Sequence, residues 1–193
     1  MRKEKRVQII LAGIGGQGVL FSSKLFSRLG LRLGSEVMGS ETHGMSQRGG
    51  SVITHLKIGD FQSPLIRTGA ADLLYSLDIE ETYRALKFLK AGGICFVNCI
   101  HPENIDERVL GYLREKDIIL ATFDASGTAV KIGSARSANV VLIGFSAGTG
   151  LIPFGADDLR KTLELVSKAK TTANNLKAFE TGYRQGLEFQ AGL

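Results

Sequence analysis

An apolar strand, a glycine-rich turn and an amphipathic helix follow one another near the start of the chain, and this unit restricts the fold more than any other feature. Arg6–Ala12 is a continuous apolar run, which is typical of a strand buried on both faces of a parallel sheet. Glycines follow it. Gln17–Leu33 then places Phe21, Leu25 and Leu29 on one helical face. The unit favours an α/β fold.

Strand and helix patterns alternate further along the chain. The later strands are predicted at Ser35–Gly39, Asp72–Leu77, Ile94–Asn98 and Ile118–Phe123. The helices are predicted at Ile79–Ala91, Ile105–Lys116, Ala125–Ile132, Ala138–Gly148, Ala156–Lys168 and Thr172–Gln190. This order predicts a Rossmann-like, doubly wound, mainly parallel sheet with a helical carboxyl-terminal part. The length of 193 residues fits a single domain over 1–193.

Local signals add two details to this scheme. Asp78 is expected to cap the helix that starts at Ile79, with Glu81 in a capping-box position and Gly92-Gly93 at its end. Strand candidates Ser51–Ile58 and Phe61–Ile66 flank Gly59-Asp60, a good two-residue turn. They predict an antiparallel hairpin added to the parallel sheet.

Composition excludes several classes of protein. The net charge is only +5, and no basic run is interleaved with aromatic residues, so nucleic-acid binding is not expected. Cys95 and Cys99 are too few for a disulfide scaffold or a four-thiolate cluster and are predicted to be buried free thiols. No residue set has metal-ligand spacing. The longest apolar stretch, Val140–Ile152, is too short to span a bilayer, so a cytoplasmic protein is expected.

The first candidate site is the glycine turn. Gly13, Gly15 and Gly18 match G-x-G-x-x-G between a strand and a helix, where free N–H groups can face an anion. Binding of NAD would need an acidic residue at the end of the second strand. Glu36 lies at the start of that predicted strand and Glu41 lies past its end. Phosphate binding or simple packing is therefore favoured over NAD binding.

The second candidate site is the polar segment within Ser40–Gly50. His43, Gln47 and Arg48 place an imidazole, an amide and a guanidinium among glycines, after a predicted strand. Ligands of open α/β sheets bind at the carboxyl ends of the strands. Arg48 is suited to clamp a carboxylate or phosphate, and His43 to donate or shuttle a proton. The alternative, a surface loop shaped by its glycines, has equal weight from the sequence.

Together these motifs resemble the small, gamma-type subunit of the 2-oxoacid:ferredoxin oxidoreductases. The resemblance rests on Gly13-Ile-Gly-Gly-Gln-Gly18 and on Glu41-Thr-His-Gly-Met-Ser-Gln-Arg-Gly-Gly-Ser51. Asn139-Val-Val-Leu-Ile-Gly144 and the Ala178-Phe179 and Gly182 region support it. The His-Gly-Met-Ser-Gln-Arg form is most similar to the indolepyruvate-type enzymes.

The resemblance implies a subunit that is inactive alone. In this family, thiamine diphosphate, Mg²⁺ and iron–sulfur clusters belong to a large partner subunit. The complex oxidatively decarboxylates a 2-oxo acid to an acyl-CoA and passes electrons to ferredoxin. This chain would bind no tightly held cofactor of its own, and CoA would be a cosubstrate. The isolated subunit is also expected to be able to self-associate.

The resemblance assigns roles to the two candidate sites. The anion-facing, cofactor-binding loop would comprise Gly13, Gly15, Gly16, Gln17 and Gly18. His43, Gln47 and Arg48 would support the partner's active site without covalent catalysis. Gly182 and Gly186, which let another backbone approach closely, or the segment Ser51–Ile66 would meet the partner. The alternatives are a stand-alone NAD(P)-dependent oxidoreductase and a CoA- or nucleotide-binding module.

Overall fold

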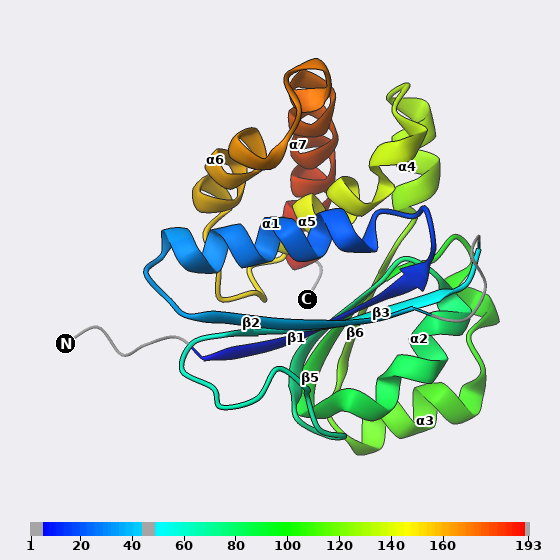
Figure 1. The fold of residues 1–193 in the computed structure, drawn as a ribbon. Helices are drawn as coiled ribbons and strands as arrows, with labels where there is room; N and C mark the ends of the chain where they lie inside the picture. Colours follow the sequence, from blue (N-terminus) through cyan, green and yellow to red (C-terminus); the bar gives the residue numbers. More distant parts are fainter. Residues whose placement is uncertain (1–5, 44–48, 192–193) are drawn as a thin grey trace.

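A six-stranded sheet with helices on both faces forms the molecule in a computed structural model that describes residues 6–43 and 49–191 (Figure 1). The strands are β1 (Val7–Ile14), β2 (Val37–His43), β3 (Ser51–Ile58), β4 (Ala71–Ser76), β5 (Leu89–Asn98) and β6 (Ile119–Phe123). Their order across the sheet is β2-β3-β1-β4-β5-β6. Strands β1, β4, β5 and β6 are parallel neighbours, whereas β3 is antiparallel to both β1 and β2.

The helices form two layers of unequal size. They are α1 (Val19–Arg32), α2 (Ile79–Ala85), α3 (Glu107–Glu115), α4 (Ala125–Lys131), α5 (Ala138–Gly148), α6 (Ala156–Val166) and α7 (Ala169–Ala191). Short 3₁₀ turns are η1 (Leu86–Phe88), η2 (Pro102–Asn104) and η3 (Ala135–Ser137). Helices α2 and α3 cover one face of the sheet, and α1 with α4–α7 lies on the other (Figure 1). The predicted doubly wound, mainly parallel α/β fold is thereby confirmed.

The predicted hairpin is wrong in its second strand. Strand β3 matches the predicted Ser51–Ile58, but Phe61–Ile66 is an irregular segment, and the antiparallel partners of β3 are β2 and β1. Pro64 has no N–H to donate to a sheet ladder, which disfavours a strand there. Strand β3 therefore lies inside the sheet, with hydrogen-bonded neighbours on both sides, and is not a free surface for a partner.

Two predicted boundaries also shift. Strand β2 runs to His43 because it pairs with β3 throughout, so the first part of the expected polar loop is a strand. The helix expected at Ile79–Ala91 ends at Ala85, because the chain turns through η1 and Leu89 already pairs with Ala71 in the sheet. Asp78 is confirmed as its N-cap and accepts hydrogen bonds from the N–H groups of Glu80 and Glu81.

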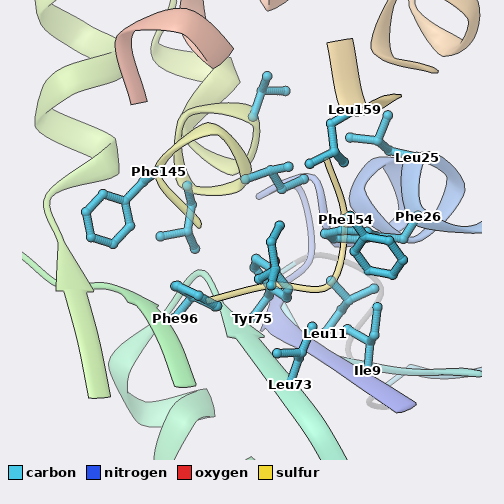
Figure 2. Close-up of a cluster of buried hydrophobic side chains, with 14 of the residues drawn as sticks. Ile9, Leu11, Leu25, Phe26, Leu73, Tyr75, Phe96, Phe145, Phe154 and Leu159 are labelled. Carbon is cyan, nitrogen blue, oxygen red and sulfur yellow. The ribbon is translucent and has the colours of Figure 1, made fainter. Parts of the chain in front are cut away.

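Two cores lie on opposite faces of the sheet. The larger core fills the space between the sheet and α1, α5 and α6, and its largest fully buried side chains include Phe26, Phe96 and Phe145 (Figure 2). Phe179 of α7 also belongs to it. Tyr75 stands at its centre, with its ring 5.0 Å from that of Phe26 and 5.1 Å from that of Phe96. Burial raises the pKa of the Tyr75 hydroxyl, which donates to Ser146 Oγ at 2.9 Å.

Helices α5 and α7 touch through their backbones. A methyl group added at Gly182 would lie 2.0 Å from the carbonyl oxygen of Val141, and one at Gly186 would lie 2.1 Å from that of Phe145. A methyl group added at Gly144 of α5 would lie 2.1 Å from the carbonyl oxygen of Phe179 in α7. The close approach expected at Gly182 and Gly186 exists, but the other backbone belongs to the same chain. These two glycines are buried and therefore do not form the partner surface.

Folding makes His55 a weaker base. His55 is 7% exposed, and its Nδ1 accepts a hydrogen bond from the N–H of Ile66 at 3.1 Å. Burial, and then the charge of Lys57, lower its pKa below the ordinary 6.5. The unfolded chain therefore binds a proton at His55 more readily than the folded chain does. The contribution of neutral His55 to the stability of the fold is fully present above pH 6.5. It is lost as the pH falls below that value.

We therefore expect acid to weaken the fold through His55. The free energy of unfolding should decrease as the pH is lowered from 6.5. His55 can account for at most about 1.4 kcal/mol of this decrease per pH unit. Urea titrations at pH 8, 7, 6 and 5 would measure the slope. His55→Gln should flatten this slope. An equal slope in His55→Gln would refute this origin.

Candidate functional site

The two predicted loops meet where the chain order of the sheet reverses. From β1 the chain continues through α1 on one face, and from β4 it continues through α2 on the other. The carboxyl ends of β1 and β4 are neighbours in the sheet, and such a switch point is where open α/β sheets bind ligands. Each candidate residue can be placed relative to this point.

The glycine turn is shorter than the motif suggests. Strand β1 continues to Ile14, so Gly13 is a strand residue that pairs with Val52. A methyl group on Gly13 would come within 2.9 Å of Gln17 Oε1 and of Val19. Gly16 and Gly18 have φ values of 100° and 93°, which favour glycine. Packing thus explains Gly13, and backbone conformation explains Gly16 and Gly18.

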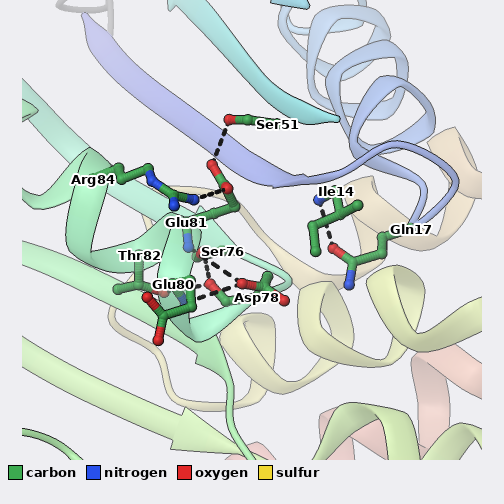
Figure 3. A network of polar contacts seen from close by, with 9 residues as sticks. All are labelled: Ile14, Gln17, Ser51, Ser76, Asp78, Glu80, Glu81, Thr82 and Arg84. Atoms are coloured by element: carbon green, nitrogen blue, oxygen red, sulfur yellow. Dashed lines mark hydrogen bonds and ion pairs between the residues drawn. The ribbon is translucent and has the colours of Figure 1, made fainter. Parts of the chain in front are cut away.

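Gln17 closes the turn with its side chain. Its Oε1 accepts a hydrogen bond from the N–H of Ile14 at 2.8 Å, and its own N–H donates to the Ile14 carbonyl oxygen at 3.1 Å (Figure 3). The side-chain oxygen Oε1 of Gln17 therefore stabilises the turn and is not directed at a ligand. Gly15 and Gly16 are the exposed part of the turn.

Asn139 fastens the start of α1 to α5. Its Nδ2 donates to the carbonyl oxygen of Gly18 at 3.1 Å and to Ser22 Oγ at 3.2 Å, and the side chain is 3% exposed. Gly18 caps α1 without a side-chain hydrogen bond, which leaves the helix end open to an anion. From the sequence, Asn139 reads as a helix-start residue. Its contact with the glycine turn, 121 residues away, had no sequence signal.

A backbone hydrogen bond joins the described parts of the two loops. The N–H of Gly15 donates to the carbonyl oxygen of Gly50 at 2.9 Å. His43 ends β2 opposite Val52, so its backbone also lies at this end of the sheet. Its side chain, like all of Gln47 and Arg48, lies outside the described part of the chain. The end of the second loop at Gly50 is thus held against the glycine turn.

A buried carboxylate anchors the same region. Glu81, 3% exposed, accepts hydrogen bonds from Ser51 Oγ and from Arg84 (Figure 3). The predicted capping box is therefore wrong in its second half, because the Glu81 carboxylate binds Ser51 at the start of β3 instead of the N–H of the Asp78 cap. Sequence reasoning saw a helix-capping residue where the structure has a support for the second loop.

Two concave regions flank the start of α1. A crevice of about 470 Å³ runs from Gln17 past Asp78, Asn98 and Cys99. Asn98 is fixed there, since its Nδ2 donates to the Leu77 carbonyl oxygen at 3.1 Å and to Ser126 Oγ at 2.9 Å. Burial raises the pKa of the Cys99 thiol, and likewise that of Cys95, so neither sulfur is an activated nucleophile.

The second concave region is a basic groove of about 650 Å³. It begins at Gly18 and Phe21 and runs between α1, η3 and the start of α7. Lys24, Arg136 and Lys168 line it, and none of the described side chains along it is acidic. Cationic side chains beside an uncapped helix start suit a phosphate-bearing ligand. We call it the basic groove below.

Strand order argues against the nicotinamide alternative. In dinucleotide-binding sheets the ribose-binding acid ends the strand beside β1. Here the second strand, β2, which carries Glu41, is separated from β1 by the antiparallel β3. Among residues 6–43 and 49–191, no group of three or more His, Cys, Asp or Glu side chains could hold a metal ion. No helix of that part is long and apolar enough for a bilayer.

Comparison with known proteins gives one consistent result. The family model described as pyruvate ferredoxin/flavodoxin oxidoreductase matches residues 8–185. The chain is 36% identical to indolepyruvate oxidoreductase subunit IorB of Archaeoglobus fulgidus, over 94% of this chain and 96% of the relative. It is 27% identical to 2-oxoglutarate synthase subunit KorC of Methanothermobacter marburgensis, over 98% and 100%.

Solved structures share the fold. The gamma subunit of a keto/oxoacid ferredoxin oxidoreductase from Geobacter sulfurreducens superposes with a TM-score of 0.70 at 22% identity, over 94% of this chain and 99% of that chain. The 2-oxoglutarate:ferredoxin oxidoreductase of Magnetococcus marinus, with 2-oxoglutarate, coenzyme A and succinyl-CoA bound, gives 0.74 at 22% identity. That match covers 96% of this chain but 32% of the larger one.

Proposed function

The chain belongs to the pyruvate ferredoxin/flavodoxin oxidoreductase family, and from this premise we propose that it is the small subunit of a thiamine-dependent 2-oxoacid:ferredoxin oxidoreductase. Its substrate would be indolepyruvate or another aryl 2-oxo acid, oxidatively decarboxylated to the acyl-CoA. A large partner subunit would carry thiamine diphosphate, Mg²⁺ and the iron–sulfur clusters. The curated indolepyruvate relatives, at 29–36% identity, support this substrate class.

The observation that carries the proposal is the basic groove beside the glycine turn. Lys24, Arg136 and Lys168 line a concave surface that starts at the uncapped end of α1. Coenzyme A carries several phosphates, and helix N-termini with nearby cations are suited to them. We place CoA in this groove, with its phosphates on the cations.

The chain's own part in the reaction is binding and orientation. Thiamine diphosphate, when bound on the partner, supplies the carbanion-stabilising chemistry. The basic groove would hold CoA so that its thiol reaches the partner's reaction centre. His43, Gln47 and Arg48 would face that centre, with Arg48 paired to the carboxylate of the 2-oxo acid. Glu81 and Gly50 would keep this loop in place through Ser51 and Gly15.

Affinity purification of the tagged chain from its native cells tests the proposal. We expect a larger chain with thiamine-enzyme sequence to co-elute in stoichiometric amount, with the brown absorbance of iron–sulfur clusters. The complex should then reduce ferredoxin with an aryl 2-oxo acid and CoA faster than with pyruvate. A colourless protein that elutes alone would contradict the subunit role, and a preference for pyruvate would contradict only the substrate class.

Arg48→Ala tests the role of the second loop. Removing one charge-assisted hydrogen bond to the substrate should lower kcat/KM of the complex for the 2-oxo acid by about 10- to 100-fold. The circular dichroism and unfolding midpoint of the isolated subunit should stay at wild-type values. Arg184→Ala, at an exposed arginine of α7 outside both loops, serves as the control for 2-oxo acid turnover. Wild-type activity in Arg48→Ala would refute the assignment.

A further inference from the structure

A buried lysine lies at the opposite end of β1 from the glycine turn. Lys57 pairs with Gln8 near the start of β1 and with Met38 of β2. It is 7% exposed, and it is the only lysine or arginine among the buried residues of the described chain. A charge is seldom buried unless an opposite charge or hydrogen bonds compensate the lost hydration. Its surroundings should therefore contain such a partner.

The neighbours of Lys57 are cations around one aromatic ring. Its Nζ lies 5.1 Å from the centre of the Phe61 ring, and the guanidinium of Arg6 lies 4.4 Å from the same centre. Burial, and then the charges of Arg67 and Arg6, lower the pKa of the Lys57 ammonium. The irregular segment after β3 brings Phe61 and Arg67 to this place, so the cluster is assembled by the fold.

No carboxylate in the described part of the chain balances these charges. In the ranges 6–43 and 49–191, none of Arg6, Lys57 and Arg67 forms an ion pair or hydrogen bond with an acidic side chain. Asp72, at the start of β4, is already engaged by the N–H of Gln8 and by Lys90 Nζ. The ring of Phe61 attracts cations but carries no net charge, so it compensates them only in part. The cluster keeps an excess of positive charge around a half-buried aromatic residue.

We propose that Arg6, Lys57 and Arg67 form a binding site for an oxyanion, either a phosphate or a carboxylate. Two guanidinium groups can each present paired N–H donors to such a group, and the ammonium of Lys57 adds a further positive charge. Binding would relieve the mutual repulsion of the cations. The site lies at the far end of β1 from the basic groove. Its free-anion source does not depend on the proposed function, whereas its partner source rests on it. Its ligand is either a free anion or a carboxylate side chain of a partner protein.

Inorganic phosphate and acetate are the probes for the free anion. At constant ionic strength set with chloride, phosphate should shift the backbone amide resonances of Lys57, Phe61 and Arg67 in a saturable way. Lys57→Met should weaken this binding at least tenfold. Because a buried substitution can disturb folding, Arg67→Gln, at an exposed residue, should weaken it as well. Lys24→Gln, in the basic groove, should leave these shifts unchanged.

The purified complex distinguishes the second source. If a partner carboxylate occupies the site, Lys57→Met and Arg67→Gln should both weaken subunit association at least tenfold. High salt should lower the association affinity of the wild type toward that of the variants. Saturable phosphate shifts in the isolated chain support the free-anion source, and weakened association supports the partner source. The site would be overturned if phosphate caused no saturable shifts and if both variants associated with the partner as tightly as the wild type. Loss of CoA binding alone would affect only the proposed function.

Discussion

Gly182→Ala should destabilise the protein by about 3 kcal/mol or more, an effect large enough to leave a marginally stable domain partly unfolded at 37 °C. The added methyl group would stand 2.0 Å from the Val141 carbonyl oxygen and 2.8 Å from the Phe145 nitrogen. Both atoms are backbone of α5, so no side-chain rotation can relieve the overlap. Helices α5 and α7 would have to separate.

Separation is costly because α5 is the most enclosed helix of the larger core. Phe145 lies on it, with its ring 4.7 Å from Phe123 and 5.4 Å from Phe189. Moving α7 away would open a gap beside these rings, and such gaps cost dispersion and burial energy. Thermal unfolding should show a drop of about 10 °C in Tm.

Gly111→Ala is the matched control. Gly111 lies within α3, and a methyl group there would meet no atom within 4 Å. Alanine favours the helix and restricts the unfolded chain, so this variant should gain about 0.5–1 kcal/mol. If Gly182→Ala melted at the wild-type temperature, the close backbone contact between α5 and α7 would not be required for the stability of the protein.

Removing the cations of the basic groove should raise the KM for CoA strongly. We expect each of Lys24→Gln, Arg136→Gln and Lys168→Gln to raise it about tenfold, because each loses one charge-assisted contact to a phosphate. The triple variant should exceed 100-fold. The kcat at saturating CoA should stay unchanged, since these contacts are made equally before and during the reaction.

Steady-state assays of the purified complex with varied CoA would measure this effect. Lys161→Gln, an exposed residue of α6 outside the groove, is the control that removes one positive charge without touching the ligand. The KM for the 2-oxo acid should not change in any of these variants. A CoA KM within twofold of the wild type in the triple variant would place CoA elsewhere.

Local patterns in the sequence were sufficient for much of the fold. Strand β3 and helix α5 have the predicted boundaries, and Asp78 caps α2 as its side chain suggests. These features depend on neighbouring residues. The position of β3 between β1 and β2 depends on pairing between distant segments, which periodicity does not encode. Phe61–Ile66 was mistaken for a strand because its apolar residues serve a loop that covers His55.

The candidate site was predictable only in outline. The sequence located both loops, and the hydrogen bond between Gly15 and Gly50 brings them together. The roles of Asn139 and Glu81 could not be predicted, because each acts on a residue distant in the chain. The assignment of Gly182 and Gly186 to a partner was wrong for the same reason, since the complementary glycines of α5 are visible only in the fold.

The insertion of β3 also constrains how the protein folds. In a simple β-α-β unit the second strand docks directly on the first, but here β2 pairs within the sheet only with β3, so it stands two strand spacings, about 10 Å, from β1. The segment from β1 to β2 therefore cannot close a sheet by itself and is not an independent folding nucleus. Strand β2 can join the sheet only through its hairpin with β3. Any slip in that hairpin would shift His43 away from Val52 and carry the second candidate loop out of register with the glycine turn.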